Sequence, residues 1–187
     1  MSSVIQTPTA TLGDLRRFEG KAELIAGRIV PLMPTGHRPN AIAGEIFVSL
    51  RGHARATGRG RAYTDNMGFA VPRLPSGRES FAPDASYYLG PMPADDMDFV
   101  DGGPTFAVEV RSKTDYGPAA EAAMAAKRAD YFLAGTSVVW DVDPRAECVR
   151  SHRADASDPP TIFNRGQLAD AEPAVPAWRM AVDDVFA

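Results

Sequence analysis

Short apolar runs separated by glycine, proline or polar turns make up much of the chain, a pattern typical of β-strands. Residues 21–33, "KAELIAGRIVPLM", contain two apolar runs around Ala26-Gly27 and predict a hairpin, because glycine readily adopts the positive φ of such a turn. Residues 61–71 predict a second hairpin that turns at 66–68. Further strands are predicted within residues 81–90, 105–110 and 137–144, and a third hairpin within residues 147–164.

Apolar residues at helical spacing predict two long helices. In the first, residues 40–58, Ile42, Ile46 and Leu50 share one face and Gly58 ends the helix. In the second, residues 114–135, Thr114 or Asp115 caps the start, and Gly135 ends the helix. Together with a short helix near residues 11–18 and a small closing element at residues 183–187, the order of elements predicts an α/β fold: a single domain with a central mixed β-sheet flanked by helices.

Composition narrows the class of protein. The 187 residues, 44% hydrophobic and 24% charged, suffice for one domain, which we place at residues 12–187 after an N-terminal tail at 1–11. Neither an apolar stretch of about 18 residues nor a secretory signal is evident, so no membrane association is expected. The single cysteine, Cys148, excludes an internal disulfide and fits a reducing, cytoplasmic location.

The net charge of -4 does not suggest nucleic-acid binding, but the charge is unevenly distributed. Residues 51–61, "RGHARATGRGR", concentrate the basic excess in Arg51, Arg55, Arg59 and Arg61. This segment is a candidate nucleic-acid-binding patch that contacts phosphates. The alternative is a solvated helix end whose cations complement the helix dipole, and the sequence leaves both open.

Two carboxylates lie where strands are predicted. Asp84 follows Pro83, and Glu109 interrupts the apolar run "TFAVEV", 25 residues later, an interval that suits neighbouring strands. Two carboxylates placed together require a cation, and hard divalent cations prefer oxygen ligands. Water on such a cation becomes a nucleophile for phosphodiester cleavage. The alternatives are a turn role for Asp84 and a structural ion pair of Glu109 with Arg111 or Lys127.

Lys127 is the candidate cationic group for this chemistry. It lies on the second long helix in line with Ala120, Met124 and Tyr131 at three- and four-residue spacing. This mildly apolar stripe predicts that Lys127 leans toward the sheet, where it can position or activate a water molecule. A solvent-facing lysine on an alanine-rich helix is the alternative.

The segments "PDASYYL", "FAVEVRSKT" and "ADYFLAGTSVVWDVDP", in this order, resemble the Uma-type restriction endonuclease family, formerly a domain of unknown function. The opening "AELIAGRIVPLMPTGHRPNAIAGEIFVSL" is also similar to that family's. The resemblance covers roughly residues 12–187 and places the chain in the PD-(D/E)XK nuclease superfamily. It implies a restriction-endonuclease-like fold, with Asp84 and Glu109 as ligands of Mg²⁺ or Mn²⁺ and the Val110 carbonyl as a further ligand.

The chain departs from the superfamily pattern at one position. The usual lysine, two residues after the second acid, is replaced by Arg111, and the resemblance implies that Lys127 on the following helix takes its role. Arginine stays charged, so Arg111 can stabilise charge or hold a phosphate but not relay a proton. Glu45 on the first long helix resembles the extra acid of many members, and its spacing with Ile42 and Ile46 allows a sheet-facing position.

Two further residues are accessory candidates. Glu23 in the first hairpin can approach the site or make a structural hydrogen bond, and His37 can contact a phosphate or brace the helix start. We therefore expect a metal-dependent endonuclease acting on DNA, as a homodimer. The alternatives are a nuclease-fold binding or regulatory module with weak or no catalysis, and a structural homo-oligomer.

Overall fold

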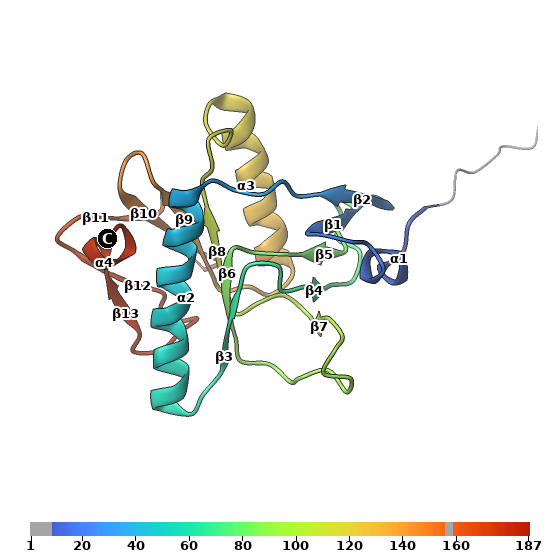
Figure 1. The fold of residues 1–187 in the computed structure, drawn as a ribbon, viewed down its shortest axis with the longest axis horizontal. Coiled ribbons are helices and arrows are strands. Elements are labelled where there is room, and N and C mark those ends of the chain that lie inside the picture. The colour runs from blue at the N-terminus through green and yellow to red at the C-terminus, as the bar shows by residue number, and fades with distance from the viewer. Residues whose placement is uncertain (1–8, 156–158) are drawn as a thin grey trace, which may run out of the picture.

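A six-stranded mixed sheet forms the centre of the computed structural model, which describes residues 9–155 and 159–187 (Figure 1). The strand order is β11-β10-β9-β8-β6-β3. Only β8 and β9 pair in parallel, and the other neighbours in this sheet are antiparallel. The strands are β3 (Arg61–Thr64), β6 (Ala85–Tyr88), β8 (Phe106–Val110), β9 (Val138–Asp143), β10 (Cys148–Arg153) and β11 (Thr161–Asn164).

Two long helices cover opposite faces of this sheet (Figure 1). Helix α2 (His37–Thr57) packs Ile42, Ile46 and Leu50 into one core with Trp140 and Val108 of the sheet. Helix α3 (Pro118–Leu133) connects the parallel strands β8 and β9, and its Tyr131 joins a second core on the other face. The predicted α/β fold with a central mixed sheet flanked by helices is confirmed.

Smaller elements surround the central sheet. Three β-units, β1-β2, β5-β4-β7 and β12-β13, are formed by β1 (Ala22–Ile25), β2 (Arg28–Pro31), β4 (Phe69–Ala70), β5 (Ser80–Phe81), β7 (Val100–Asp101), β12 (Leu168–Asp170) and β13 (Arg179–Ala181). The short helices are α1 (Leu12–Arg16) and α4 (Val182–Val185). Hairpin β1–β2 is the one predicted around Ala26-Gly27. Because β1 contacts β5, it also lies beside the segment that leads into β6.

Three local predictions are wrong. Residues 61–71 do not form a hairpin, because β3 pairs with β6 while β4 pairs with β5 and β7 of another sheet. Residues 81–90 do not form one strand, since Pro83 separates β5 from β6. The N-cap of α3 is Gly117 rather than Thr114 or Asp115, and the Asp115 carboxylate instead accepts a hydrogen bond from Ser112 N.

The ends of the chain add two observations. Residues 1–8 of the predicted tail lie outside the described residues, whereas Ala10 N donates to Gly27 O and Thr11 caps α1. In the described part of the chain, every helix is too short or too polar to cross a membrane.

Candidate active site

Asp84 and Glu109 lie at the same end of two paired strands. Ala85 of β6 pairs with Val108 of β8, so Asp84 immediately precedes the ladder where β8 approaches its end. The backbone fixes Asp84 twice: its N–H donates to Val108 O at 3.1 Å, and its Oδ2 accepts from Val110 N at 2.8 Å. The predicted neighbourhood of the two acids therefore follows from the antiparallel pairing.

Lys127 reaches Glu109 from α3. Its Nζ lies 2.9 Å from Glu109 Oε1 and 3.0 Å from Oε2. The Tyr131 hydroxyl, one helical turn later, donates to Glu109 Oε1 at 2.6 Å. Lys127 thus leans toward the sheet, as the apolar stripe of α3 predicts, and two groups of one helix face hold the Glu109 carboxylate.

Glu23 brings a third carboxylate to the same place. Its side chain lies on β1, is almost fully buried, and its Oε1 is 3.1 Å from Lys127 Nζ. Arg78 pairs with Glu23 from the other side and donates to Asp130 Oδ2 at 3.0 Å. Both readings of Glu23 therefore apply: it approaches the site through Lys127, and it is part of a buried ionic network.

Lys21 also belongs to this group, although it is not among the site residues predicted from the sequence. Its Nζ is 3.0 Å from Asp84 Oδ1, and it forms a second ion pair with Asp65. The signal that could have found it is its spacing from Glu23, because side chains two residues apart point to the same side of an extended chain.

These groups line one cavity of about 500 Å³. Its lining includes the acids Glu23, Asp84 and Glu109, with Asp115 just before the start of α3, and the two lysines Lys21 and Lys127. The cavity lies where β1, β8 and α3 meet, which explains why three distant segments of sequence are needed to form it.

The charges in the cavity perturb one another. Burial, together with the negative charges of Asp84 and Glu23, raises the pKa of Glu109 above its usual value despite the attraction of Lys127. Burial opposes the charge on Lys127, but the attraction of Glu109 and Glu23 outweighs it and raises the pKa of Lys127. Burial likewise disfavours the charge on Glu23, yet Lys127 and Arg78 lower its pKa. Lys127 is therefore an ammonium group at neutral pH.

Arg111 is engaged elsewhere. Its Nε and Nη2 donate to the two oxygens of Asp141 at 2.7 and 2.6 Å, and Nη2 also donates to Glu121 at 3.0 Å. Arg111 borders the cavity, but its bidentate pair with Asp141 ties the end of β8 to β9, and its bond to Glu121 ties it to α3. Of the two ion pairs considered for Glu109, the structure contains the one with Lys127.

Two accessory candidates lie outside the cavity. Glu45 is exposed, because Ile42 and Ile46 direct the other side of α2 to the sheet; the sheet-facing position allowed by its spacing is not adopted. His37 is exposed at the first position of α2, and its N-cap, Gly36, makes no side-chain capping bond. Helix α2 also covers the face of the sheet opposite to α3 and Lys127.

The arginine patch is likewise separate from the cavity. Arg51, Arg55, Arg59 and Arg61 are all exposed, at and after the C-terminal end of α2. Arg61 pairs with Tyr88 at one end of the β3–β6 ladder, whereas Thr64 pairs with Ala85 at the end next to Asp84.

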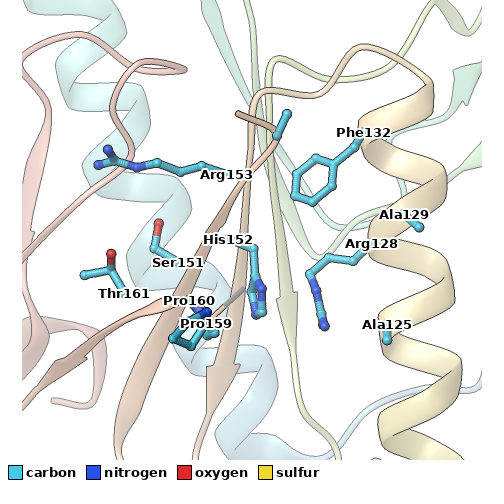
Figure 2. A pocket seen from close by; sticks show the side chains of 11 residues that line it. Ala125, Arg128, Ala129, Phe132, Ser151, His152, Arg153, Pro159, Pro160 and Thr161 are labelled. Atoms are coloured by element: carbon cyan, nitrogen blue, oxygen red, sulfur yellow. The ribbon is translucent and has the colours of Figure 1, made fainter. Parts of the chain in front are cut away.

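A second cavity, of about 260 Å³, lies between α3 and β10. Figure 2 shows Arg128 of the helix and His152 of the strand pointing toward each other across it, with the Phe132 ring at one side. Its described lining residues include no carboxylate and none of the residues that line the first cavity. The acid pair therefore lies at the first cavity and not at the second.

The donor set of the first cavity fits a hard cation with few protein ligands. Val110 N points to Asp84, and its carbonyl lies on the same side of β8, because Arg111 N of the next residue bonds to β9. Asp84, Glu109 and this carbonyl are oxygen donors. Within the described residues, no group of three or more His, Cys, Asp or Glu side chains is placed to hold a metal. Mg²⁺ is commonly bound by one or two carboxylates and retains several waters, so two acids suffice.

Comparisons with known proteins identify the fold and the family of the chain. The solved structures that match include a crystal structure described as a "putative nuclease belonging to DUF820" from Anabaena variabilis. It has 19% sequence identity and a TM-score of 0.73, and the match covers 94% of this chain and 97% of that one, which shows a shared fold. No curated protein matches the sequence. The family model described as "Uma2: Putative restriction endonuclease" matches residues 12–183, and the chain therefore belongs to the Uma2 family.

Proposed function

We propose that the protein is a metal-dependent phosphodiester hydrolase that cleaves DNA. The observation that carries this proposal is the meeting of Asp84, Glu109 and Lys127 at one cavity, from three separate elements. Membership of a family described as "Putative restriction endonuclease" and a fold shared with a protein described as a "putative nuclease" support a nucleic-acid substrate.

Asp84, Glu109 and the Val110 carbonyl would hold the cation, Mg²⁺ or Mn²⁺. When bound, such an ion supplies a Lewis acid and lowers the pKa of a coordinated water. The Asp84 carboxylate accepts a hydrogen bond from Val110 N, and the Glu109 carboxylate accepts one from the Tyr131 hydroxyl. Both carboxylates are therefore oriented before a cation binds.

Lys127 has a positioning and charge-stabilising role in this proposal. Because its pKa is raised, it donates hydrogen bonds as an ammonium group and orients the attacking water or stabilises negative charge on the phosphate. Glu23 forms an ion pair with Lys127 on the buried side of the cavity, and Arg78 forms an ion pair with Glu23. Glu23 and Arg78 therefore act through Lys127. The exposed arginines of residues 51–61 are proposed to contact phosphates outside the cavity.

Cleavage of supercoiled plasmid DNA in Mg²⁺ or Mn²⁺ tests the proposal. We expect Glu109→Gln and Lys127→Met each to lower the cleavage rate by at least about a hundredfold, a usual effect of removing a charge-stabilising or acid–base group. Lys113→Met is the matched control, because Lys113 is exposed and does not line the cavity. Equal rates in the wild type and Glu109→Gln would contradict the proposal.

A second candidate, a nuclease-fold binding protein without catalysis, is favoured by one observation. Each acid of the pair already has a lysine partner, Lys21 on Asp84 and Lys127 on Glu109. If these ion pairs persist in Mg²⁺, the site remains closed to the cation. DNA binding without Mn²⁺ binding would favour this candidate over the hydrolase.

A further inference from the structure

Lys21 lies between a carboxylate of the candidate site and a carboxylate outside it. Its Nζ is 3.0 Å from Asp84 Oδ1 and also forms an ion pair with Asp65. The Lys21 side chain is 18% exposed, whereas that of Asp65 is 42% exposed. One partner thus belongs to the proposed cation site, and the other lies on the outer turn that follows β3.

Lys21 and a divalent cation compete for the same oxygen. Asp84 Oδ2 accepts a hydrogen bond from Val110 N, so Oδ1 is the oxygen more available to a cation. Because like charges repel, an ion on Oδ1 would weaken the contact with Lys21. The ion pair with Asp65 then keeps the Lys21 ammonium group at the cavity. The N–H donor that Asp84 no longer accepts from becomes available to another acceptor.

The other cations around the cavity are held more firmly. Arg78 is buried between Glu23 and Asp130, and Arg111 makes its bidentate pair with Asp141. Lys127 is shared by Glu109 and the buried Glu23. Among these, Lys21 is the one that combines a partner on the proposed cation site with a partner on an exposed turn.

We propose that Lys21 is a further substrate-contacting residue: it neutralises Asp84 in the metal-free protein and, once Asp84 holds a divalent cation, donates to a phosphate oxygen of the nucleic acid. Asp65 is its positioning residue. This inference rests on the proposed function for the identity of the substrate, but its two steps, exchange with a cation and contact with phosphate, are measurable without cleavage.

Calorimetric titration with Mn²⁺ tests the exchange. We expect Lys21→Met to bind Mn²⁺ at least about threefold more tightly than the wild type, because removing a partly exposed ion pair frees Asp84. Lys113→Met removes the same charge from an exposed site and is expected to leave Mn²⁺ affinity unchanged. Asp65→Asn leaves Lys21 only Asp84 as a partner and should weaken Mn²⁺ binding.

Fluorescence anisotropy with a labelled 20-base-pair DNA duplex, in Ca²⁺ and over a range of NaCl concentrations, tests the phosphate contact. Loss of one phosphate contact lowers the slope of log affinity against log salt by about one. We expect this change and a severalfold loss of affinity in Lys21→Met, but not in Lys113→Met. Lys21→Arg retains the charge and should keep the slope of the wild type, which a merely structural role would not predict.

The outcomes separate this inference from the proposed function. Unchanged Mn²⁺ affinity or an unchanged salt slope in Lys21→Met overturns the role of Lys21, as does absence of DNA binding by the wild type. If both titrations behave as expected but the wild type does not cleave DNA, the proposed hydrolysis fails and the role of Lys21 stands. Thermal melting of each variant shows that it is folded. Asp65→Asn tests the exchange of Lys21 for a cation at Asp84 in a protein that retains Lys21.

Discussion

At the scale of single residues, the chemistry of the cavity depends on a buried ionic network behind it. Arg78 lies between Glu23 and Asp130, and all three side chains are less than 10% exposed. A buried charge that loses its partner costs far more than the pair contributes when intact. Arg78 is thus required for stability and, through Glu23, for the position of Lys127.

We expect Arg78→Met to lower the free energy of unfolding by about 3–5 kcal/mol at pH 7, because it leaves Glu23 and Asp130 without their shared cation. Urea denaturation of the variant and of Arg73→Met, an exposed arginine in the same segment, measures the difference. A loss no larger than that of Arg73→Met would show that the network contributes little.

The pH dependence of this difference has a definite sign. The pKa of Glu23 is lowered in the folded protein, so its ionisation stabilises the fold above the unfolded pKa, near 4.5, and this contribution is lost as pH falls through the folded value. Arg78→Met removes one cause of that lowering. The gap in unfolding free energy between wild type and variant should therefore shrink as pH falls below about 4.5. A gap that stays constant in this range would contradict this.

The sequence identified residues whose polarity conflicts with their surroundings. Glu109 interrupts an apolar strand, and Lys127 lies on a mildly apolar stripe, so the sequence predicts both as site residues, and both line the cavity. Lys21 precedes its strand in a polar segment and gives no such conflict. Glu45 is a candidate through the family resemblance. Helical periodicity does not specify which face of the sheet a helix covers, and α2 covers the face opposite to α3.

At the scale of elements, strong local signals predicted β8, β9, α2 and α3, whereas strand partners depended on distant segments. The local sequence predicts a hairpin for β3, but its partner is β6, and the turn after β3 leads into another sheet. The entry to β3 is set by close packing: Gly60 has φ of +67°, and a Cβ there would lie 2.4 Å from the Tyr87 ring.

Two glycines in this segment separate backbone strain from packing. Gly58 has a similar φ of +65° but open space around its Cβ position, so Gly58→Ala should cost about 1–2 kcal/mol from the left-handed backbone alone. Gly60→Ala should cost about 1–3 kcal/mol more, because Tyr87 of the core must move. Chemical denaturation measures both, and equal losses would contradict the role of Tyr87.

At the scale of the whole molecule, the sheet, α3 and hairpin β1–β2 converge on a cavity where acids and lysines are paired. The alternation of helices and strands was enough to predict this architecture. The contact of β1 with β5, next to the entry to β6, brings Lys21 and Glu23 to the cavity and has no counterpart in local sequence. Homodimer formation stays a prediction, as does the DNA contact of the arginine patch.

Because lysines already neutralise the acids, the fold should not depend on a divalent cation. We expect EDTA to leave the melting temperature unchanged. Mg²⁺ or Mn²⁺ at about a hundred times its Kd should stabilise the protein by about 2.7 kcal/mol, which raises the melting temperature by roughly 5–10 °C in a chain of this size. Glu109→Gln removes a proposed ligand and should reduce this rise, whereas Lys113→Met should retain it. Unfolding by EDTA would contradict a site that is balanced by its own lysines, and an equal rise in Glu109→Gln would exclude Glu109 as a ligand.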